Sequence, residues 1–264
     1  MPRYHSTCGL RPDQLDELTT RLQQAHHEAP FTHKYNFTMA FAQAVIMVLI
    51  MIRHNLTQQL VADLYGIAQP TVCRIWRYLY PMIGQVTAMN RQELAQALER
   101  GIVIVDGTPI PTGNRVKTGK DNWNHKHHKQ ALGIQVATYL DGKLAAVSKP
   151  VKGSRHDSKA LEDVGWAQQI AAAQAADPLF AALADSAYIV HTDLAVRRKK
   201  PRQPRSEQDK VFNQVISHYR AAVERGIAHL KQWKILATGY RGPLDELPTM
   251  IQVVTNLEFF RQNT

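Results

Sequence analysis

Cysteine is nearly absent from this sequence, since Cys8 and Cys73 are the only two among 264 residues. So few cysteines argue against the disulfide framework of a small secreted domain and suit a reducing compartment. The first residues lack the apolar stretch of a secretory signal. The longest apolar run, residues 39–52, contains Gln43 and falls short of the roughly 20 residues of a transmembrane helix. We therefore expect a cytoplasmic protein in which residues 39–53 form a buried helix.

Internal repeats and glycine-rich phosphate loops are also absent, so the sequence does not predict a doubly wound nucleotide-binding fold. Acidic residues are fewer than basic ones: 22 Asp and Glu against 32 Lys and Arg give a net charge of +10. Residues 1–100 carry nine basic and seven acidic side chains, and residues 101–264 carry 23 and 15. The excess predicts a polyanionic partner, bound mostly by the second part of the chain.

The first hundred residues are predicted to be helical. Leucines 15, 18 and 22 recur at helical spacing after Pro12, a residue that suits the first turn of a helix. The segment 57–80 is divided by Gly66 and Pro70, which predicts two short helices around a tight turn. A further helix is expected over residues 90–100, with Asn90 as its cap.

From Gly101 onward the pattern indicates strands. GIVIVD is typical of a strand buried on both faces, and the runs 132–140 and 143–151 flank Asp141-Gly142, which predicts a hairpin. A helix is expected from about 157 to 176, a buried strand over 179–185 and a long helix over 206–233. This order predicts an α/β domain with a mixed sheet, residues 101–264, preceded by a small all-α domain, residues 1–100.

Two aspartates are predicted to close apolar strands: Asp106 in IVIVDGTPI and Asp185 in LFAALADSAY. Burying a lone carboxylate costs several kcal/mol unless it is paired or bound to metal, although either residue could instead form a turn or cap a helix. Glu224 lies in the long helix between Arg220 and Lys231. Alone, Glu224 is better explained as part of a surface ion-pair stripe. Together, three carboxylates suffice to hold two divalent cations for displacement at phosphorus.

Four segments make a family resemblance specific: VDGTPIP, KPVKGSRHDSKAL, ADSAY and FNQVISHYRAAVERGIAHLK, in this order. They resemble the catalytic domain of DDE-superfamily insertion-sequence transposases, in the group related to the Harbinger transposases. The resemblance runs from about Gly101 to Asn256, with VVTNLEFF as the closing helix. It implies an RNase H-like fold, two Mg²⁺ or Mn²⁺ ions, and Asp106, Asp185 and Glu224 as the triad. It also implies double-stranded DNA as partner, a dimer or larger assembly on DNA, and a place at a prokaryotic nucleoid.

Two stretches depart from the family's pattern. Ser186 and Ala187 stand where a small basic or glycine turn is usual, and NWNHKHHK replaces a Tyr-Ser-Gly-Lys-like stretch. The histidines of residues 125–128 could form a transition-metal site, but the interleaved lysines favour a loop that faces the DNA backbone. Asp157 is predicted to cap the helix that follows it. The resemblance makes His156 and Asp157 accessory residues near the site, along with Arg220 and Lys231.

The segment LTQQLVADLYGIAQPTVCRIWRYL, residues 56–79, is predicted to be a helix-turn-helix. Gly66 allows the left-handed turn and Ala62 a close helix contact. Helical hairpins that bind no DNA look much the same, and the resemblance to the family's helix-turn-helix favours DNA recognition. The expected buried face is Leu60, Leu64, Ile67, Val72 and Ile75, and the expected DNA contacts are Gln69, Thr71, Arg74 and Arg77.

A basic, proline-broken run at residues 197–205 is expected to be a loop. It is either a solvated segment or a set of phosphate contacts, and a DNA-binding protein favours the second. Its first four cations, Arg197, Arg198, Lys199 and Lys200, are therefore candidate DNA ligands. The leading hypothesis is a transposase that binds terminal inverted repeats, hydrolyses the 3′ strand and transfers the 3′-hydroxyl to target DNA. The alternatives are a helix-turn-helix regulator or domesticated derivative without catalysis, and a nuclease without strand transfer.

Overall fold

The computed structural model describes residues 4–30, 35–113, 115, 120–177, 182–196, 198 and 206–264. The chain forms two units, each with its own packing: residues 1–91 with 230–264, here called the helical unit, and residues 92–229, the sheet unit. These limits differ from the single boundary after residue 100 that the sequence suggested. No helix among the described residues is long and apolar enough to cross a membrane.

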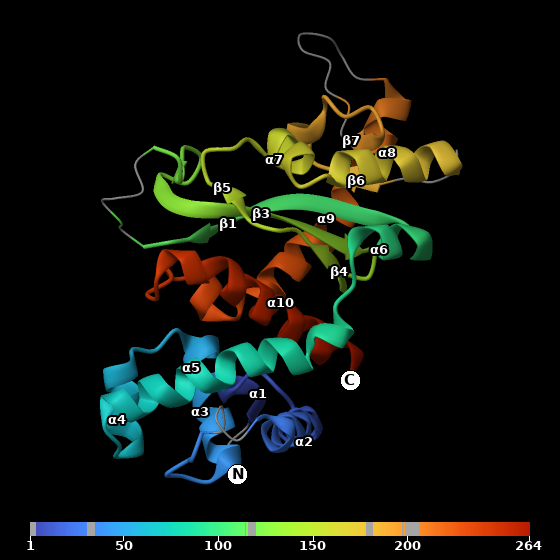
Figure 1. Cartoon of the computed structure of the whole chain (residues 1–264). Helices are drawn as coiled ribbons and strands as arrows, with labels where there is room; N and C mark the ends of the chain where they lie inside the picture. The colour runs from blue at the N-terminus through green and yellow to red at the C-terminus, as the bar shows by residue number, and fades with distance from the viewer. Residues whose placement is uncertain are drawn as a thin grey trace. The chain divides into compact units, whose positions relative to one another are not determined.

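The helical unit is built around one long helix, α5. Its elements are α1 (Tyr4–Thr7), α2 (Pro12–Glu28), α3 (Phe41–His54), α4 (Gln58–Tyr65), α5 (Gln69–Val86), η2 (Ala88–Asn90), η5 (Lys234–Leu236), η6 (Leu244–Glu246) and α10 (Leu247–Asn263). Helix α5 packs against α2, α3, α4 and α10 (Figure 1). Its apolar positions Val72, Ile75, Leu79 and Ile83 are completely buried, as the 3.6-residue period requires.

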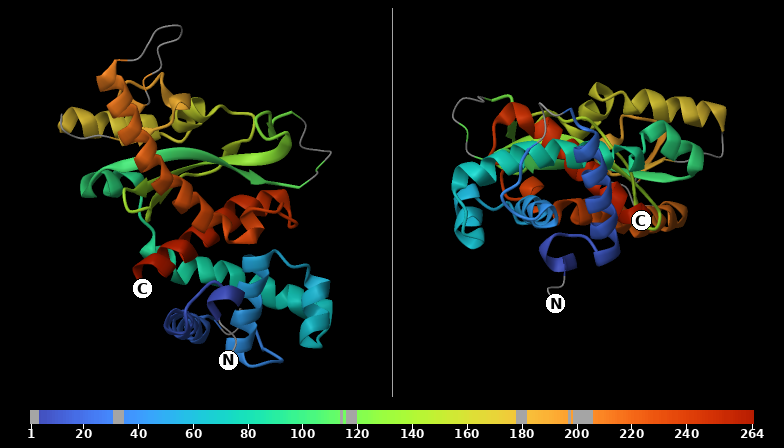
Figure 2. Two further views of the ribbon diagram at one scale, coloured as in Figure 1. Left: turned by 180° about the vertical axis from the view of Figure 1, so that it is seen from behind. Right: turned by 60° about the horizontal axis from the view of Figure 1, so that its bottom comes forward.

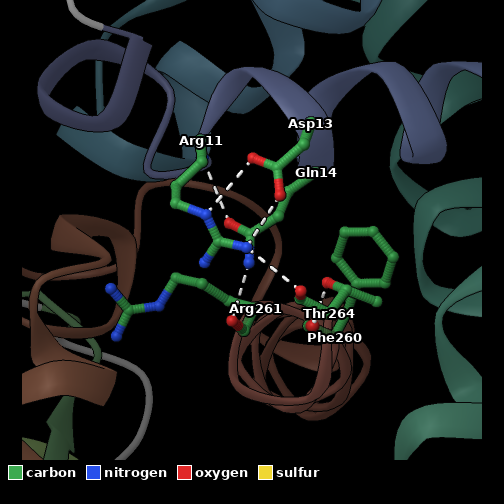
Figure 3. Close-up of polar contacts among 6 residues, drawn as sticks. All are labelled: Arg11, Asp13, Gln14, Phe260, Arg261 and Thr264. Carbon is green, nitrogen blue, oxygen red and sulfur yellow. Dashed lines mark hydrogen bonds and ion pairs between the residues drawn. The ribbon is translucent and has the colours of Figure 1, made fainter.

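Helix α10 completes the core of the helical unit, which is why residues 230–264 belong with the first ninety. Asn256 donates to the carbonyl of Gly84 (2.9 Å), where the missing side chain of glycine lets α10 approach α5. At the chain end, Arg11 donates to the Thr264 carbonyl (3.0 Å) and Gln14 to that of Arg261 (2.8 Å) (Figure 3).

A buried ion pair lies behind these contacts. Glu258 is fully buried, pairs with Arg261 (2.6 Å) and accepts a hydrogen bond from the Trp233 indole (3.0 Å). Both ions belong to α10, so it is the bond from Trp233 that ties the pair to another segment, and removing Arg261 would leave an uncompensated buried charge.

The sheet unit carries a mixed sheet with helices on both faces. Its elements are α6 (Leu94–Arg100), β1 (Val103–Pro111), β2 (Trp123–Asn124), β3 (Lys129–Tyr139), β4 (Leu144–Val147), β5 (Val151–Lys152), α7 (Asp157–Asp163), α8 (Trp166–Ala176), β6 (Ala182–Ala184), η4 (Ser186–Tyr188), β7 (Leu194–Val196) and α9 (Glu207–Lys231), whose last turn reaches past residue 229. The strand order is β2-β3-β1-β6-β7, with β4 and β5 also paired to β3. Strands β1 and β3 are antiparallel, whereas β1, β6 and β7 are parallel. The predicted α/β class with an RNase H-like mixed sheet is confirmed.

Alternating residues of the central strands face two different cores. Val103 and Val105 pack with α6, α7 and α8 on one face, and Ile104 packs with α9 on the other. Figure 2 shows α9 crossing the sheet on the side opposite α7 and α8. The helix lies close to β3 because residue 226 is glycine, and a Cβ there would collide with the methyl group of Thr138. The expectation that the first strand is buried on both faces is therefore correct.

Several element limits differ from those predicted. Strand β1 continues past Asp106 to Pro111, because β3 pairs with it along its whole length. The helix expected over 157–176 is two helices, since Gly165 adopts a left-handed conformation (φ +77°) between them. The helix expected from Asn90 begins at Leu94. The three-residue strand β7 was not predicted.

Candidate active site

Asp106 and Asp185 lie side by side because of the register between β1 and β6. The parallel pairing ends with Val105 opposite Ala184, so each aspartate is the next residue on its strand. Side chains two residues apart on a strand share a face. Asp106 therefore points to the face of Ile104, and Asp185 to the face of Leu183, which is the face that α9 covers.

Asp185 is held by donors from its own turn and from α9. It accepts hydrogen bonds from the Ser186 amide and hydroxyl, and Arg220 approaches its Oδ1 to 3.4 Å. Burial alone raises the pKa of Asp185, but the bond from Ser186 and the positive charges of Arg220 and Lys126 outweigh it, so the pKa lies below 3.8. Asp185 is thus ionised at neutral pH.

Glu224 reaches the same region from α9. Arg220, one helical turn earlier, lies 3.4 Å from Asp185 and 3.8 Å from Glu224, so its guanidinium stands between the two carboxylates. The Glu224 side chain is 63% exposed, in contrast to 26% for Asp185. The long helix therefore brings to the strand ends both a solvated acid and the cation that bridges it to the sheet.

Asp106 has the most unusual electrostatic environment of the three. Burial raises the pKa of Asp106 to about 6, and the negative charges of Asp157 and Asp185 add to the effect. The hydrogen bond from the Gly107 amide (2.8 Å) and the charge of Arg220 only partly oppose it. The protein therefore supplies too little positive charge around the Asp106 carboxylate to offset the cost of burying it.

Asp157 is a fourth carboxylate of this region, with a role other than the predicted one. His156, not Asp157, is the cap residue of α7, and its side chain makes no capping bond. The Asp157 carboxylate lies against Gly107, where a Cβ would collide with it. Since Gly107 and Asp106 face opposite sides of β1, Asp157 approaches from the α7 side. The cap prediction was wrong because α7 already begins at Asp157, so the cap position is His156.

Tyr188 and Gln135 connect this arrangement to the core, and no sequence pattern pointed to either residue. The buried Tyr188 hydroxyl donates to the Gln135 side chain (2.6 Å). Gln135 is the β3 partner of Gly107, and its backbone amide binds the Ser148 hydroxyl (2.9 Å). Burial and the charges of Asp157 and Asp106 raise the pKa of Tyr188 well above 10, which keeps the hydroxyl protonated as a donor.

The donor set fits a hard divalent cation. Carboxylate oxygens are the ligands that Mg²⁺ and Mn²⁺ prefer, and the uncompensated charge around Asp106 is what a cation would neutralise. Among the described residues, no three acidic, histidine or cysteine side chains already surround a common point. Arg220 supplies part of the positive charge instead, between Asp185 and Glu224.

A tight hairpin tip places basic residues beside the aspartates. Residues 125–128 join β2 to β3, the Asn124 side chain accepts from the His127 amide (2.9 Å), and His128 takes a left-handed conformation (φ +49°). Lys126 and His127 line a small hollow together with Gly107 and Asp157. Lys126 is exposed, as a residue that meets a DNA backbone must be.

The predicted helix-turn-helix is formed by α4 and α5. Thr57 caps α4 by accepting from the Leu60 amide (3.2 Å), and Gly66 ends it in the left-handed conformation (φ +64°). One expectation was wrong: Leu60 and Leu64 are 45% and 67% exposed, whereas Val61 and Ala62 are buried. Helix α4 is therefore rotated by about one residue relative to the predicted face.

The candidate DNA contacts of α5 differ in exposure. Gln69 donates to Gln58 across the turn (2.6 Å) and is half-buried. Arg74 is exposed and donates to the Thr71 hydroxyl (3.3 Å), and Arg77 is exposed as well. The two arginines thus lie on the solvent side of the second helix, where the prediction placed them.

The remaining residues predicted to bind DNA or to assist the site are not brought to the carboxylates by any contact that the described residues show. Arg197, Lys199 and Lys200 lie outside the described residues. Arg198 pairs with Asp209 (3.2 Å) and lies over the Phe212 ring (4.4 Å), so it already has partners on α9. Lys231 is the last residue of α9 and belongs to the helical unit.

Comparison with known proteins relates both units to the same superfamily. The family model of the DDE superfamily endonucleases matches residues 105–258, and that of the helix-turn-helix of DDE superfamily endonucleases matches residues 38–86. A candidate transposase for insertion sequence element IS112 from Streptomyces albus G is 28% identical over 231 residues, which cover 86% of this chain and 83% of the relative. No solved structure matches the chain. The chain therefore belongs to the DDE superfamily of endonucleases.

Proposed function

We propose that the protein is a DNA transposase that binds the terminal inverted repeats of its element, hydrolyses the 3′ strand and transfers the 3′-hydroxyl to target DNA. One observation carries this proposal. Asp106 and Asp185 lie next to each other, each directly after the paired residues of the adjacent parallel strands β1 and β6, and α9 brings Glu224 to them. Family membership and the transposase relative support the same chemistry.

In this proposal the three carboxylates hold two divalent cations, Mg²⁺ or Mn²⁺, which supply Lewis acidity for in-line displacement at phosphorus. Asp106 and Asp185 bind through the rigid strand ends, and the exposed Glu224 adjusts from the helix. Arg220 then becomes free to bind the scissile phosphate, because its present partners are the same carboxylates. Lys126 holds the neighbouring DNA backbone from the hairpin tip.

Duplex DNA is the proposed partner at two places, the element end and the target. The α4–α5 pair reads the end, and the basic hairpin tip and the cations of residues 197–200 contact phosphates. Because two ends must be joined to one target, we infer a dimer or larger assembly on DNA. The rival proposals are a DNA-binding regulator without catalysis and a nuclease that cleaves without transfer.

Cleavage and transfer can be tested separately with the purified chain. A duplex that carries the element's end should be cut at the 3′ strand in Mg²⁺ or Mn²⁺ and remain intact in EDTA. A pre-cleaved end should be joined to a supercoiled plasmid under the same conditions. Binding without cutting would favour the regulator, and cutting without joining of the pre-cleaved end would favour the stand-alone nuclease.

Recognition of the end is expected to depend on Arg74. Replacing it with alanine removes an exposed donor of α5, and a lost base contact costs about 1–3 kcal/mol, or roughly 5- to 150-fold in affinity. Fluorescence anisotropy with the terminal sequence and a scrambled duplex would measure the change. The control is Lys234→Ala, an exposed cation of η5. If the ratio of the two affinities were the same before and after Arg74→Ala, Arg74 would have no part in reading the sequence.

A further inference from the structure

A cavity of about 600 Å³ lies within the helical unit, beside the first half of α5. The C-terminal end of α3 and the first turn of α4 form one side of it. The residues of α5 that line it are Gln69, Cys73, Trp76 and Arg77, and the segment 235–246 forms the opposite wall. Its volume falls in the range of about 300–1,000 Å³ that is typical of pockets for small ligands. Nothing in the fold or in the proposed chemistry uses this space.

The cavity has an apolar interior and a basic rim. Met51, Ile235 and Tyr240 are almost completely buried at its walls, and the half-buried Trp76 presents an aromatic ring. Arg77 and Arg241 are exposed and enter from opposite walls. Neither arginine forms an ion pair with any residue that the structure describes.

The far wall, segment 235–246, is held by hydrogen bonds from the end of α3 and does not need a ligand to order it. Asn55 ends α3 in a left-handed conformation (φ +53°), and its side chain donates to the Thr238 hydroxyl (2.8 Å) and the Gly239 carbonyl (3.0 Å). The one acidic group of the lining, Glu246, is engaged by the Tyr80 hydroxyl. Two arginines and one carboxylate therefore line the cavity, and because its far wall is already held, a ligand that fills it need not order the loop.

These walls match the chemistry of a single nucleotide. A flat aromatic ring stacks on a base whatever its sequence, amides can bind the base edge, and guanidinium groups bind the phosphate. An intact duplex offers phosphates to the rim but no group that would fill an apolar interior. Arg77 also belongs to the outward side of α5, so DNA held there passes the mouth of the cavity.

We propose that the cavity receives one nucleotide that is unstacked from the DNA bound by the helix-turn-helix, with its base against Trp76 and its phosphate between Arg77 and Arg241. The proposal rests on the proposed binding of element ends. An extruded base leaves a gap in the duplex. Extrusion at one base pair would therefore fix the register of the element's end on the helix-turn-helix.

Mismatch scanning tests the proposal, because a mismatched base is easier to unstack than a paired one. Duplexes of the element's end would each carry one mismatch, moved along the sequence, and affinities would be measured by anisotropy. We expect the full chain to bind one of these duplexes about 5- to 10-fold more tightly than the paired duplex. No position with such a gain would overturn the proposal, whereas failure to bind the paired end at all would count against the proposed function instead.

Two variants locate the effect. Cys73→Phe fills the cavity from α5, and Arg241→Ala removes the cation of the far wall, and each should abolish the gain from the mismatch. Lys234→Ala, whose side chain does not line the cavity, should keep it. Circular dichroism would show that Cys73→Phe is folded, and Arg241→Ala carries the test if it is not. If Arg241→Ala weakened paired and mismatched duplexes equally, the arginine would contact an intact backbone and the proposal would be wrong.

Discussion

Replacing Asp106 by asparagine, or Glu224 by glutamine, is expected to reduce metal-dependent cleavage of the element's end by at least about 1,000-fold. Each substitution keeps the size of the side chain and removes one negative charge, so the loss follows from weaker metal binding and not from a cavity. The Gly107 amide can still donate to the asparagine carbonyl, which preserves the local turn. Binding of the uncut end should change by less than about threefold, because neither residue belongs to α4 or α5.

Matched substitutions elsewhere in the sheet unit provide the control. Asp141→Asn changes an acid of the hairpin turn, and Glu207→Gln changes an exposed acid in the first turn of α9 that pairs with Lys210. Both should cleave at the parental rate. Cleavage rates would be measured on labelled ends in Mg²⁺ and in Mn²⁺. Parental cleavage by Asp106→Asn or Glu224→Gln would remove that residue from the triad.

The same Asp106→Asn substitution is expected to stabilise the metal-free protein at neutral pH. The pKa of Asp106 is about 6 in the folded chain against 3.8 for an ordinary aspartate, so the folded state binds the proton more tightly. Between these two values the folded state carries more protons than the unfolded state, and stability falls as the pH rises. Above pH 6 the whole penalty is present, and below pH 3.8 it is absent.

The size of this penalty follows from the shift. A shift of this extent corresponds to about 3 kcal/mol at most, and partial contact with solvent reduces the expected gain to about 1–2 kcal/mol. Urea unfolding in EDTA from pH 4 to 8 would measure it, with the difference between variant and parent growing toward high pH. A variant that is less stable at pH 7.5 than the parent would contradict the buried-charge account.

Asp185→Asn should behave in the opposite way. The pKa of Asp185 lies below its ordinary value, so its ionised form stabilises the fold at neutral pH and this contribution is lost as the pH falls. Its asparagine variant loses the ion pair with Arg220 and should unfold at lower urea concentration at pH 7.5. A gain in stability for Asp106→Asn and a loss for Asp185→Asn would show that nearby positive charge compensates the Asp185 carboxylate but not that of Asp106.

Sequence reasoning selected the three carboxylates of the proposed triad but not how they meet. Asp106 and Asp185 follow apolar runs, which local physics marks as unusual, whereas the pairing of Val105 with Ala184 depends on long-range register that no local pattern contains. Glu224 depended on the family resemblance, since its helix position alone suits a surface ion pair. The error at Asp157 has the same origin, because a cap explains the residue fully until Gly107 is placed against it.

In the helix-turn-helix, α4 was predicted correctly as a helix, but the side that it buries was predicted wrongly. Leu60 and Leu64 have helical spacing and are apolar, yet Val61 and Ala62 fill the space toward α5. Two adjacent apolar stripes compete on this eight-residue helix, and only the contact with α5 decides between them. Strand β7 was missed because three residues are too few to establish a period.

The helical unit is assembled from two stretches of chain that are made far apart in time. Helices α2 to α5 leave the ribosome first, and α10, with Glu258 and Asn256, follows only after the whole sheet unit. A nascent or truncated chain that lacks α10 therefore has a helix-turn-helix without its supporting core, open to proteolysis. The packing of α5 against α10 is thus complete only in chains that extend through α10.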